Sequence, residues 1–253
     1  MTWERGDIFR PAQWTSLLHG ADYVVHSLGI LLEADYKGVI SGRESPLAGL
    51  RRAFGPGPEG GARNPLERVR RFEEGDGGGV GEGSKGEEGG KEGSGGGGGG
   101  PQLTYEMMNR DSTILLAKEA AKAGVGAFGF VSAAAGAPVL PSRYLSTKRE
   151  AEAVVAREFP EMRGVFFRPP FMYDKSRGVT MGVAAMATAG SVFNDLTRGA
   201  AGGFLGSMVM KPLKVDAVAD AVVEALADES VKGPVEVPQL EQLAEKAWRK
   251  TML

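Results

Sequence analysis

Short apolar runs alternate with amphipathic stretches along most of this chain, and this alternation constrains its fold more than any other feature. Residues 22–26, 126–132 and 164–168 are runs of strand length that are rich in Val, Phe or Tyr. The last run is followed by Pro169 and Pro170, through which a helix cannot continue. The three runs therefore predict strands.

Helical patterns lie between and around these runs. Apolar side chains at three- and four-residue spacing predict helices over residues 12–19, 105–123, 142–157, 215–228 and 240–250. Strands that alternate with helices in this way form a mostly parallel sheet covered on both faces. We therefore predict a doubly wound, Rossmann-like α/β fold.

A glycine-rich segment interrupts the pattern at residues 55–101. It is nearly all Gly, Glu, Arg, Lys, Ser and Pro, with six consecutive glycines at 95–100. Such a segment buries too little apolar surface to offset the entropy of ordering it, so we predict a disordered insertion. A docking tail or a phosphate-binding loop would need flanking strand and helix signals. The insertion divides one domain into residues 1–54 and residues 102–253, which end in a small substrate-side region.

Charge and residue types exclude several classes of function. The formal net charge is −2 and the pI is about 5.9, with no basic patch for phosphates, so we expect no nucleic-acid partner. The chain has no cysteine, which excludes disulfides, thiolate catalysis and Cys-based metal sites. His19 and His26 are the only imidazoles, so we expect no metal site.

Targeting and membrane signals are also weak. Residues 1–10 include Glu4 and Asp7 and form neither an apolar secretory core nor an acid-poor presequence. The longest uncharged stretch, residues 178–194, is too short and too rich in Gly, Ala, Thr and Ser for a membrane span. We expect a soluble chain, and peripheral membrane contact stays open.

Tyr144 and Lys148 form the pair with the clearest chemical meaning. They stand four residues apart in a predicted helix, so both side chains lie on one face. An ammonium beside a phenol favours the phenolate, which would let Tyr144 exchange a proton with a substrate carbonyl or hydroxyl. A solvated helix face is the alternative. The helix follows the strand that ends near Ser132, and ligands bind at this edge of open α/β sheets.

Seven motifs in order resemble those of the atypical and extended short-chain dehydrogenases. They are Gly6-Asp7-Ile8, Val24-Val-His-Ser-Leu-Gly29, Asn109, Val131-Ser132, Tyr144-x3-Lys148, Arg168-Pro169 and Pro212-Leu-Lys-Val-Asp216. Within that superfamily the sequence is most similar to two mitochondrial groups. These are the fungal coenzyme Q biosynthesis accessory proteins, which are the nearer match, and the nucleotide-binding accessory subunit of respiratory complex I. The resemblance covers almost the whole chain outside the insertion.

The resemblance implies an NAD or NADP site with Tyr144 and Lys148 as the catalytic pair. The cofactor-binding positions it implies are Asp7, Ile8, Ser27, Leu28, Gly29, Ser132, Lys148 and Pro169. Asn109 would support the helix that carries the pair. Each position has a structural alternative: a turn at Asp7, a strand end at 27–29, and a water-facing polar residue at Asn109. We interpret His26 as a packed strand residue.

Two departures from the family pattern argue against simple catalysis. The position that polarises the substrate carbonyl in active members falls on Ala134, although Thr147 or Ser142 offers a substitute hydroxyl. In addition, no strand, glycine-rich turn and helix precede Asp7, and residues 2–5 resemble the third strand of the family order. We therefore expect an N-terminally truncated domain that binds dinucleotide poorly, because it lacks the usual phosphate cradle.

Two functions remain as hypotheses. The first is a scaffold or regulatory accessory protein of mitochondrial coenzyme Q biosynthesis, with protein partners in that assembly or a respiratory one, and inner-membrane contact left open. The second is an active NAD(P)-dependent oxidoreductase acting on a quinone-pathway or other carbonyl compound through Tyr144 and Lys148. A lipid or quinone pocket over residues 181–210 is a weaker alternative to ordinary packing of small residues.

Overall fold

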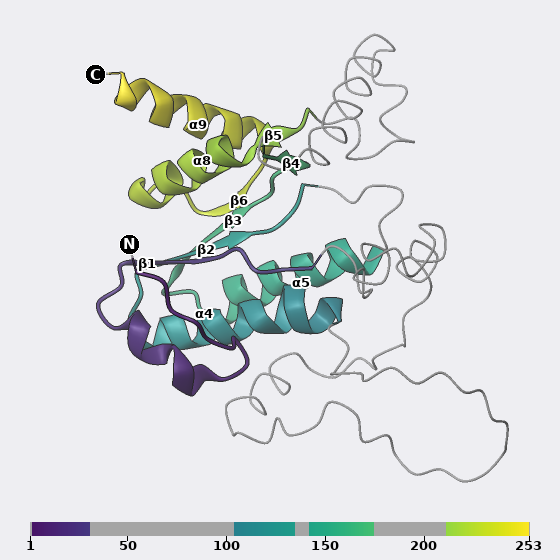
Figure 1. The fold of residues 1–253 in the computed structure, drawn as a ribbon, viewed down its shortest axis with the longest axis vertical. Helices are drawn as coiled ribbons and strands as arrows, with labels where there is room; N and C mark the ends of the chain where they lie inside the picture. Colours follow the sequence, from purple (N-terminus) through teal and green to yellow (C-terminus); the bar gives the residue numbers. More distant parts are fainter. Residues whose placement is uncertain (1, 31–103, 135–141, 175–210, 253) are drawn as a thin grey trace, which may run out of the picture.

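The structure is a computed structural model, and it describes residues 2–30, 104–134, 142–174 and 211–252 (Figure 1). The expected insertion at 55–101 and the small-residue region at 181–210 lie outside the described residues. The boundaries proposed for the domain parts stay predictions.

A four-stranded parallel sheet forms the centre of the described fold, in the order β1-β2-β3-β6. Its strands are β1 (Tyr23–His26), β2 (Ala127–Val131), β3 (Arg163–Phe167) and β6 (Gly233–Val235). Val25 pairs with Gly129, Phe130 with Phe166, and Phe167 with Val235. Because the strands are parallel, their carboxyl ends meet at one edge of the sheet. A separate two-stranded sheet joins β4 (Met172–Tyr173) to β5 (Leu213–Lys214).

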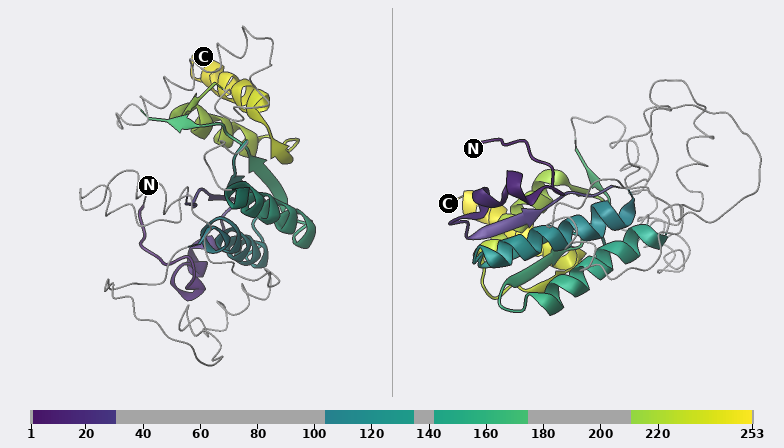
Figure 2. Two further views of the ribbon diagram at one scale, coloured as in Figure 1. Left: turned by 90° about the vertical axis from the view of Figure 1, so that its right-hand side faces the viewer. Right: turned by 90° about the horizontal axis from the view of Figure 1, so that it is seen from below.

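Helices cover both faces of this sheet, as Figures 1 and 2 show. Helices α4 (Ser112–Lys122) and α5 (Ser142–Glu158) pack on one face, where Phe128, Phe130 and Phe166 are buried. Helices α8 (Val215–Ala227) and α9 (Val237–Thr251) pack on the other, over Val165 and Phe167. Strands buried on both faces read as continuous apolar runs, which is why the sequence predicts them well. The doubly wound α/β fold is confirmed.

Two local predictions at the N-terminus are wrong. Residues 2–5 form no strand, and Trp3 is 84% exposed. No described strand lies beside this segment to pair with it, and a lone extended segment gains no ladder hydrogen bonds. The helix expected over 12–19 is instead two short 3₁₀ helices, η1 (Pro11–Gln13) and η2 (Thr15–Leu18).

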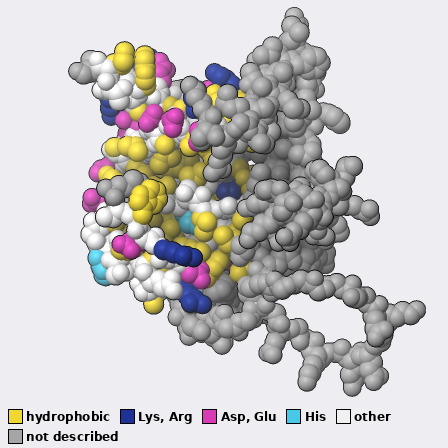
Figure 3. Space-filling view, in the orientation of Figure 1, with side chains coloured by type: hydrophobic (Ala, Val, Ile, Leu, Met, Phe, Trp, Pro, Cys, Tyr) yellow, Lys and Arg dark blue, Asp and Glu magenta, His cyan; other side chains and the backbone are white. Residues whose placement is uncertain are grey.

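Strand β1 presents different chemistry on its two faces. Tyr23 and Val25 are 49% and 42% exposed, and Figure 3 shows hydrophobic side chains between α8 and β1. Side chains alternate along a strand, so Val24 and His26 point to the opposite face, toward α4. This alternation buries His26 at the carboxyl end of β1.

Candidate functional site

The candidate site lies where β1 and β2 end and the carboxyl half of the sheet meets α5. Strand β1 leads into Ser27–Ile30 and β2 into Ser132–Ala134, while α5 brings Tyr144 and Lys148. The buried residues Ala151 and Val155 anchor α5 against the phenylalanines of the sheet. The structure therefore places the predicted pair at the edge where ligands bind in open α/β sheets.

Lys148 is almost completely buried. Its side chain is held by a hydrogen bond of 2.9 Å from Nζ to the Val131 carbonyl oxygen. The ammonium also lies 5.0 Å from the centroid of the Phe130 ring and 5.8 Å from that of Tyr144. Burial lowers the pKa of Lys148 to about 8, against an opposing effect of Glu152. The amine is thus directed into the protein and titrates near physiological pH.

Tyr144 behaves differently from the sequence expectation. Burial raises the pKa of its phenol above the ordinary value, and the opposing cation is Arg149. The expected lowering by Lys148 is therefore wrong for the protein as it stands. The Tyr105 ring meets that of Tyr144 edge-on at 6.0 Å. The phenol is protonated at neutral pH.

Asn109 ties the loop after β1 to the site. It lies in the π-helix η3 (Glu106–Asp111), a form of helix that is frequent at functional sites. Its amide oxygen accepts from the Ile30 N–H at 2.9 Å, and its amide nitrogen donates to the Ile30 carbonyl at 3.2 Å. A methyl group at Gly29 would lie 2.9 Å from the Asn109 oxygen and 3.5 Å from Lys148 Nζ. Glycine therefore permits the loop to approach both side chains.

Ser132 accepts a hydrogen bond from Arg149, which lies on α5 like Tyr144 and Lys148. The guanidinium donates to the Ser132 hydroxyl at 3.0 Å and to the carbonyls of Ala133 and Ala134 at 2.6 and 3.0 Å. Ala134 supplies no side-chain donor, and Thr147 donates to the carbonyl of residue 143 at 2.7 Å. Neither of these positions directs a hydroxyl toward a substrate carbonyl.

An ion network continues from Arg149 across the end of the sheet. Glu152, 4% exposed, accepts from Arg149 at 2.5 Å and also pairs with Arg168. Arg168 in turn donates to Glu236 at 2.5 Å, and Glu236 caps the first turn of α9. Pro169 contributes its carbonyl, which accepts from the backbone N–H of residue 134 at 2.9 Å. These bonds join β2, β3, α5 and α9 into one unit.

The remaining predicted cofactor positions are not linked to the pair by the described contacts. Ser27 and Leu28 are exposed at the end of β1. Asp7 and Ile8 lie in the N-terminal segment, where their carbonyls accept from the Trp14 indole at 3.0 and 3.2 Å. Asp7 also lines an open hollow of about 600 Å³. Their cofactor roles stay predictions.

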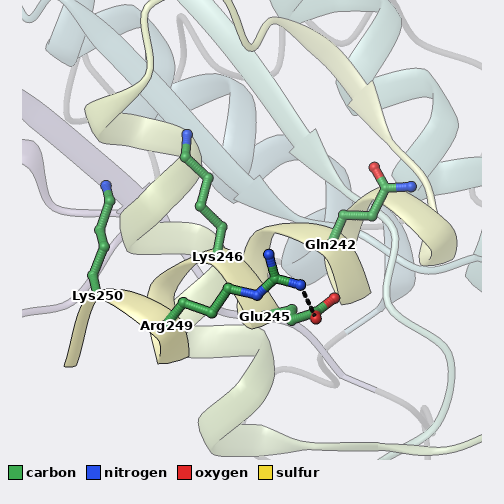
Figure 4. Close-up of a pocket in the computed structure, with 5 residues that line it drawn as sticks. All are labelled: Gln242, Glu245, Lys246, Arg249 and Lys250. Atoms are coloured by element: carbon green, nitrogen blue, oxygen red, sulfur yellow. Dashed lines mark hydrogen bonds and ion pairs between the residues drawn. The ribbon is translucent and has the colours of Figure 1, made fainter. Parts of the chain in front are cut away.

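A second hollow, of about 390 Å³, lies on α9 (Figure 4). Its cations are paired with acids: Lys246 with Glu224 at 2.9 Å, Lys250 with Glu224 at 2.7 Å, and Arg249 with Glu245 at 2.5 Å. The two pairs with Glu224 join α9 to α8 and the third lies within α9, which gives the hollow a structural explanation.

His26 is the residue at the site that sequence reasoning interpreted only as packing. It is 2% exposed, and its two ring nitrogens contact the hydroxyls of Ser112 and Thr113 at 3.2 and 3.3 Å. Its position at the end of a strand, before a Ser-Leu-Gly turn, was the available signal. Among the described residues, no three acids or histidines gather as a metal site, and no helix is long and apolar enough to cross a membrane.

No model of a known protein family matches the chain. It is 34% identical over 191 residues to MIOREX complex component 2 of Saccharomyces cerevisiae. That alignment covers 69% of this chain and 56% of the yeast protein, so the chain spans little more than half of the relative's length. The resemblance to the atypical short-chain dehydrogenases rests on the sequence motifs.

Solved structures overlap the chain at lower similarity. DesIV of Streptomyces venezuelae, a dTDP-glucose 4,6-dehydratase with NAD bound, is 13% identical, with 98% of this chain and 62% of that one covered and a TM-score of 0.44. RMD of Pseudomonas aeruginosa in complex with NADPH is also 13% identical, with 96% and 69% covered and a TM-score of 0.47. At this level of overlap, the fold assignment rests on the sheet topology described above.

Proposed function

We propose that this protein is an accessory component of a mitochondrial protein assembly that serves coenzyme Q biosynthesis, acting as a scaffold that holds NAD or NADP weakly. The observation that carries the proposal is the lack of a side-chain donor at Ala134, the position of the usual donor, while the Thr147 hydroxyl donates to the carbonyl of residue 143 in its own helix. Catalysis at a carbonyl needs a donor aimed at the developing oxyanion. Here the Thr147 hydroxyl and the Arg149 guanidinium both donate to groups of the protein itself.

The nucleotide part of the proposal rests on the residues around Lys148. Its ammonium has three donors, of which one bonds the Val131 carbonyl, and Gly29 of the loop after β1 lies beside it. This donor set suits the ribose hydroxyls of a dinucleotide. Asp7 and Ile8 are proposed to flank the adenine. Weak binding of the dinucleotide is part of this proposal.

The assembly and its compartment are supported by similarity. The yeast relative is by its name a component of a complex, which supports protein partners for this chain. The segment from Ser132 to Gly136, followed by Tyr144-Leu-Ser-Thr-Lys148, resembles the mitochondrial coenzyme Q accessory proteins and supports the pathway and the compartment. Peripheral contact with the inner membrane belongs to the same proposal.

The retained pair of Tyr144 and Lys148 supports an alternative, an active NAD(P)-dependent oxidoreductase. A bound nicotinamide would supply the hydride, and Tyr144 would exchange the proton with the substrate oxygen. Burial raises the pKa of the Tyr144 phenol, which favours its role as proton donor to a substrate oxygen over its role as base.

Replacement of Tyr144 by Phe distinguishes the two functions. The full-length gene carrying Tyr144→Phe would replace the native copy, with Tyr23→Phe at a half-exposed tyrosine as the control. The scaffold predicts unchanged coenzyme Q and an intact complex in both strains. A fall in coenzyme Q with normal protein and complex levels in the Tyr144→Phe strain alone would overturn the proposal in favour of the enzyme.

Titration of NADH and NADPH onto the purified protein tests the nucleotide part. We expect a millimolar Kd that Lys148→Met weakens at least tenfold, while Lys232→Met at an exposed lysine changes nothing. A sub-millimolar Kd for the parent protein would contradict weak binding. If Lys148→Met bound the nucleotides as tightly as the parent does, the proposed contact of Lys148 with the ribose would be contradicted.

A further inference from the structure

His26 is held from both sides by consecutive hydroxyls in the first turn of α4. Its Nε2 lies 3.2 Å from Ser112 Oγ and its Nδ1 lies 3.3 Å from Thr113 Oγ1. The ring also packs on Phe130 with a centroid distance of 5.7 Å. Contacts at both nitrogens fix the orientation of an imidazole, so this histidine does more than fill space.

A count of protons decides which nitrogen carries hydrogen. Each hydroxyl has one proton and a second acceptor: Ser112 donates to the Met108 carbonyl at 2.7 Å, and Thr113 to the Asn109 carbonyl at 3.2 Å. If Nε2 carries the proton, Ser112 keeps its short bond and only the longer bond of Thr113 competes with Nδ1. If Nδ1 carries it, the short bond of Ser112 is lost. The Nε2–H tautomer is therefore favoured.

The imidazolium would satisfy all four contacts, but it would add a second buried cation near Lys148. Burial, followed by the charge of Lys148, lowers the pKa of His26 to about 3. The ring is therefore neutral at physiological pH.

The contacts of His26 extend to the candidate site. Ser112 and Thr113 bond back to the carbonyls of residues 108 and 109, inside the π-helix η3. The Asn109 amide in turn forms hydrogen bonds with both the N–H and the carbonyl of Ile30, the residue after Gly29. Gly29 lies close to Lys148. We infer that His26, as the neutral Nε2–H tautomer, is a positioning residue that sets the π-helix and thereby places the loop after β1 over Lys148.

The tautomer is independent of any ligand, whereas the role of the positioned loop in holding a nucleotide rests on the proposed function. Nitrogen-15 NMR of the histidine-labelled protein at pH 7 reads the tautomer directly. The chain contains only two histidines, and exposed His19 is assigned with a His19→Gln variant. We expect His26 to show a protonated Nε2 and an unprotonated Nδ1. A protonated Nδ1 would overturn the inference.

Two hydroxyl variants test the proton count without removing the ring. Ser112→Ala removes the acceptor at Nε2, so the proton should move to Nδ1 and be donated to Thr113. Thr113→Val keeps the shape and should leave the Nε2–H tautomer unchanged. The opposite pattern, with a switch in the Thr113 variant alone, would overturn the inference.

Amide exchange tests the positioning role. His26→Phe should speed exchange of the Ile30 amide about tenfold, the equivalent of one hydrogen bond of about 1.4 kcal/mol, while His19→Phe should not. Ser112→Ala provides the same readout if His26→Phe does not fold. Unchanged protection of Ile30 in folded variants would overturn the positioning role. Failure of NADH and NADPH to bind the parent protein would instead overturn the proposed function and leave these results standing.

Discussion

Replacement of Lys148 by Met should stabilise the fold at neutral pH while removing the proposed ribose contact. The pKa of Lys148 falls from 10.5 to about 8, and each unit corresponds to about 1.4 kcal/mol, so the buried ammonium costs about 3 kcal/mol at pH 7. Methionine removes that cost but also the donor to the Val131 carbonyl, which is worth about 1–2 kcal/mol. We expect Lys148→Met to be about 1–2 kcal/mol more stable.

The pH dependence gives the decisive comparison. Between about pH 8 and 10.5 the unfolded chain binds more protons at Lys148 than the folded one, so stability rises with pH in this window. Urea denaturation should show that the parent gains about 2 kcal/mol relative to Lys148→Met between pH 7 and pH 10. Lys232→Met, at an exposed lysine, should follow the parent. A constant difference between parent and Lys148→Met across this range would refute the reasoning.

Two further predictions concern the architecture around the site, and both are read from urea denaturation midpoints. Glu152→Gln leaves two guanidinium groups without their buried carboxylate and should cost about 3 kcal/mol, whereas exposed Glu241→Gln should be nearly neutral. Equal effects of the two changes would argue against the ion network. Gly29→Ala would place a methyl group 2.9 Å from the Asn109 oxygen and should cost about 1–3 kcal/mol. Gly126→Ala, with its nearest atom at 3.5 Å, is the control, and a matching loss there would remove the steric explanation.

Burial on both faces made most of the sheet predictable from sequence. Phe128, Phe130 and Phe167 are fully buried, and such strands appear as apolar runs. Strand β6 was not predicted because it is only three residues long and contains Pro234, which has no backbone N–H to donate to a neighbouring strand. The error at residues 2–5 has the opposite cause, since a family strand order was imposed on a segment that has no neighbouring strand among the described residues.

The site was only half predictable because its key contacts join distant parts of the chain. The spacing of Tyr144 and Lys148 is local, and the helix places both as expected. By contrast, Asn109 meets Ile30 across 79 residues, and His26 meets Ser112 across 86. A π-helical segment also shifts side-chain direction without changing the apolar pattern, so the stretch at 105–123 read as one ordinary helix.

The partners to which the polar side chains of the candidate site donate bear on the choice between scaffold and enzyme. For the Arg149 guanidinium to polarise a substrate carbonyl, it would have to give up its bonds to the Ser132 hydroxyl, to the carbonyls of Ala133 and Ala134, or to Glu152. Bonds to charged groups contribute about 1.5–3 kcal/mol each, so a rearrangement that broke several of them would consume most of the binding energy of a weak ligand. A site that is closed by its own side chains gains rigidity instead, and rigidity across β2, β3, α5 and α9 is what a scaffold requires.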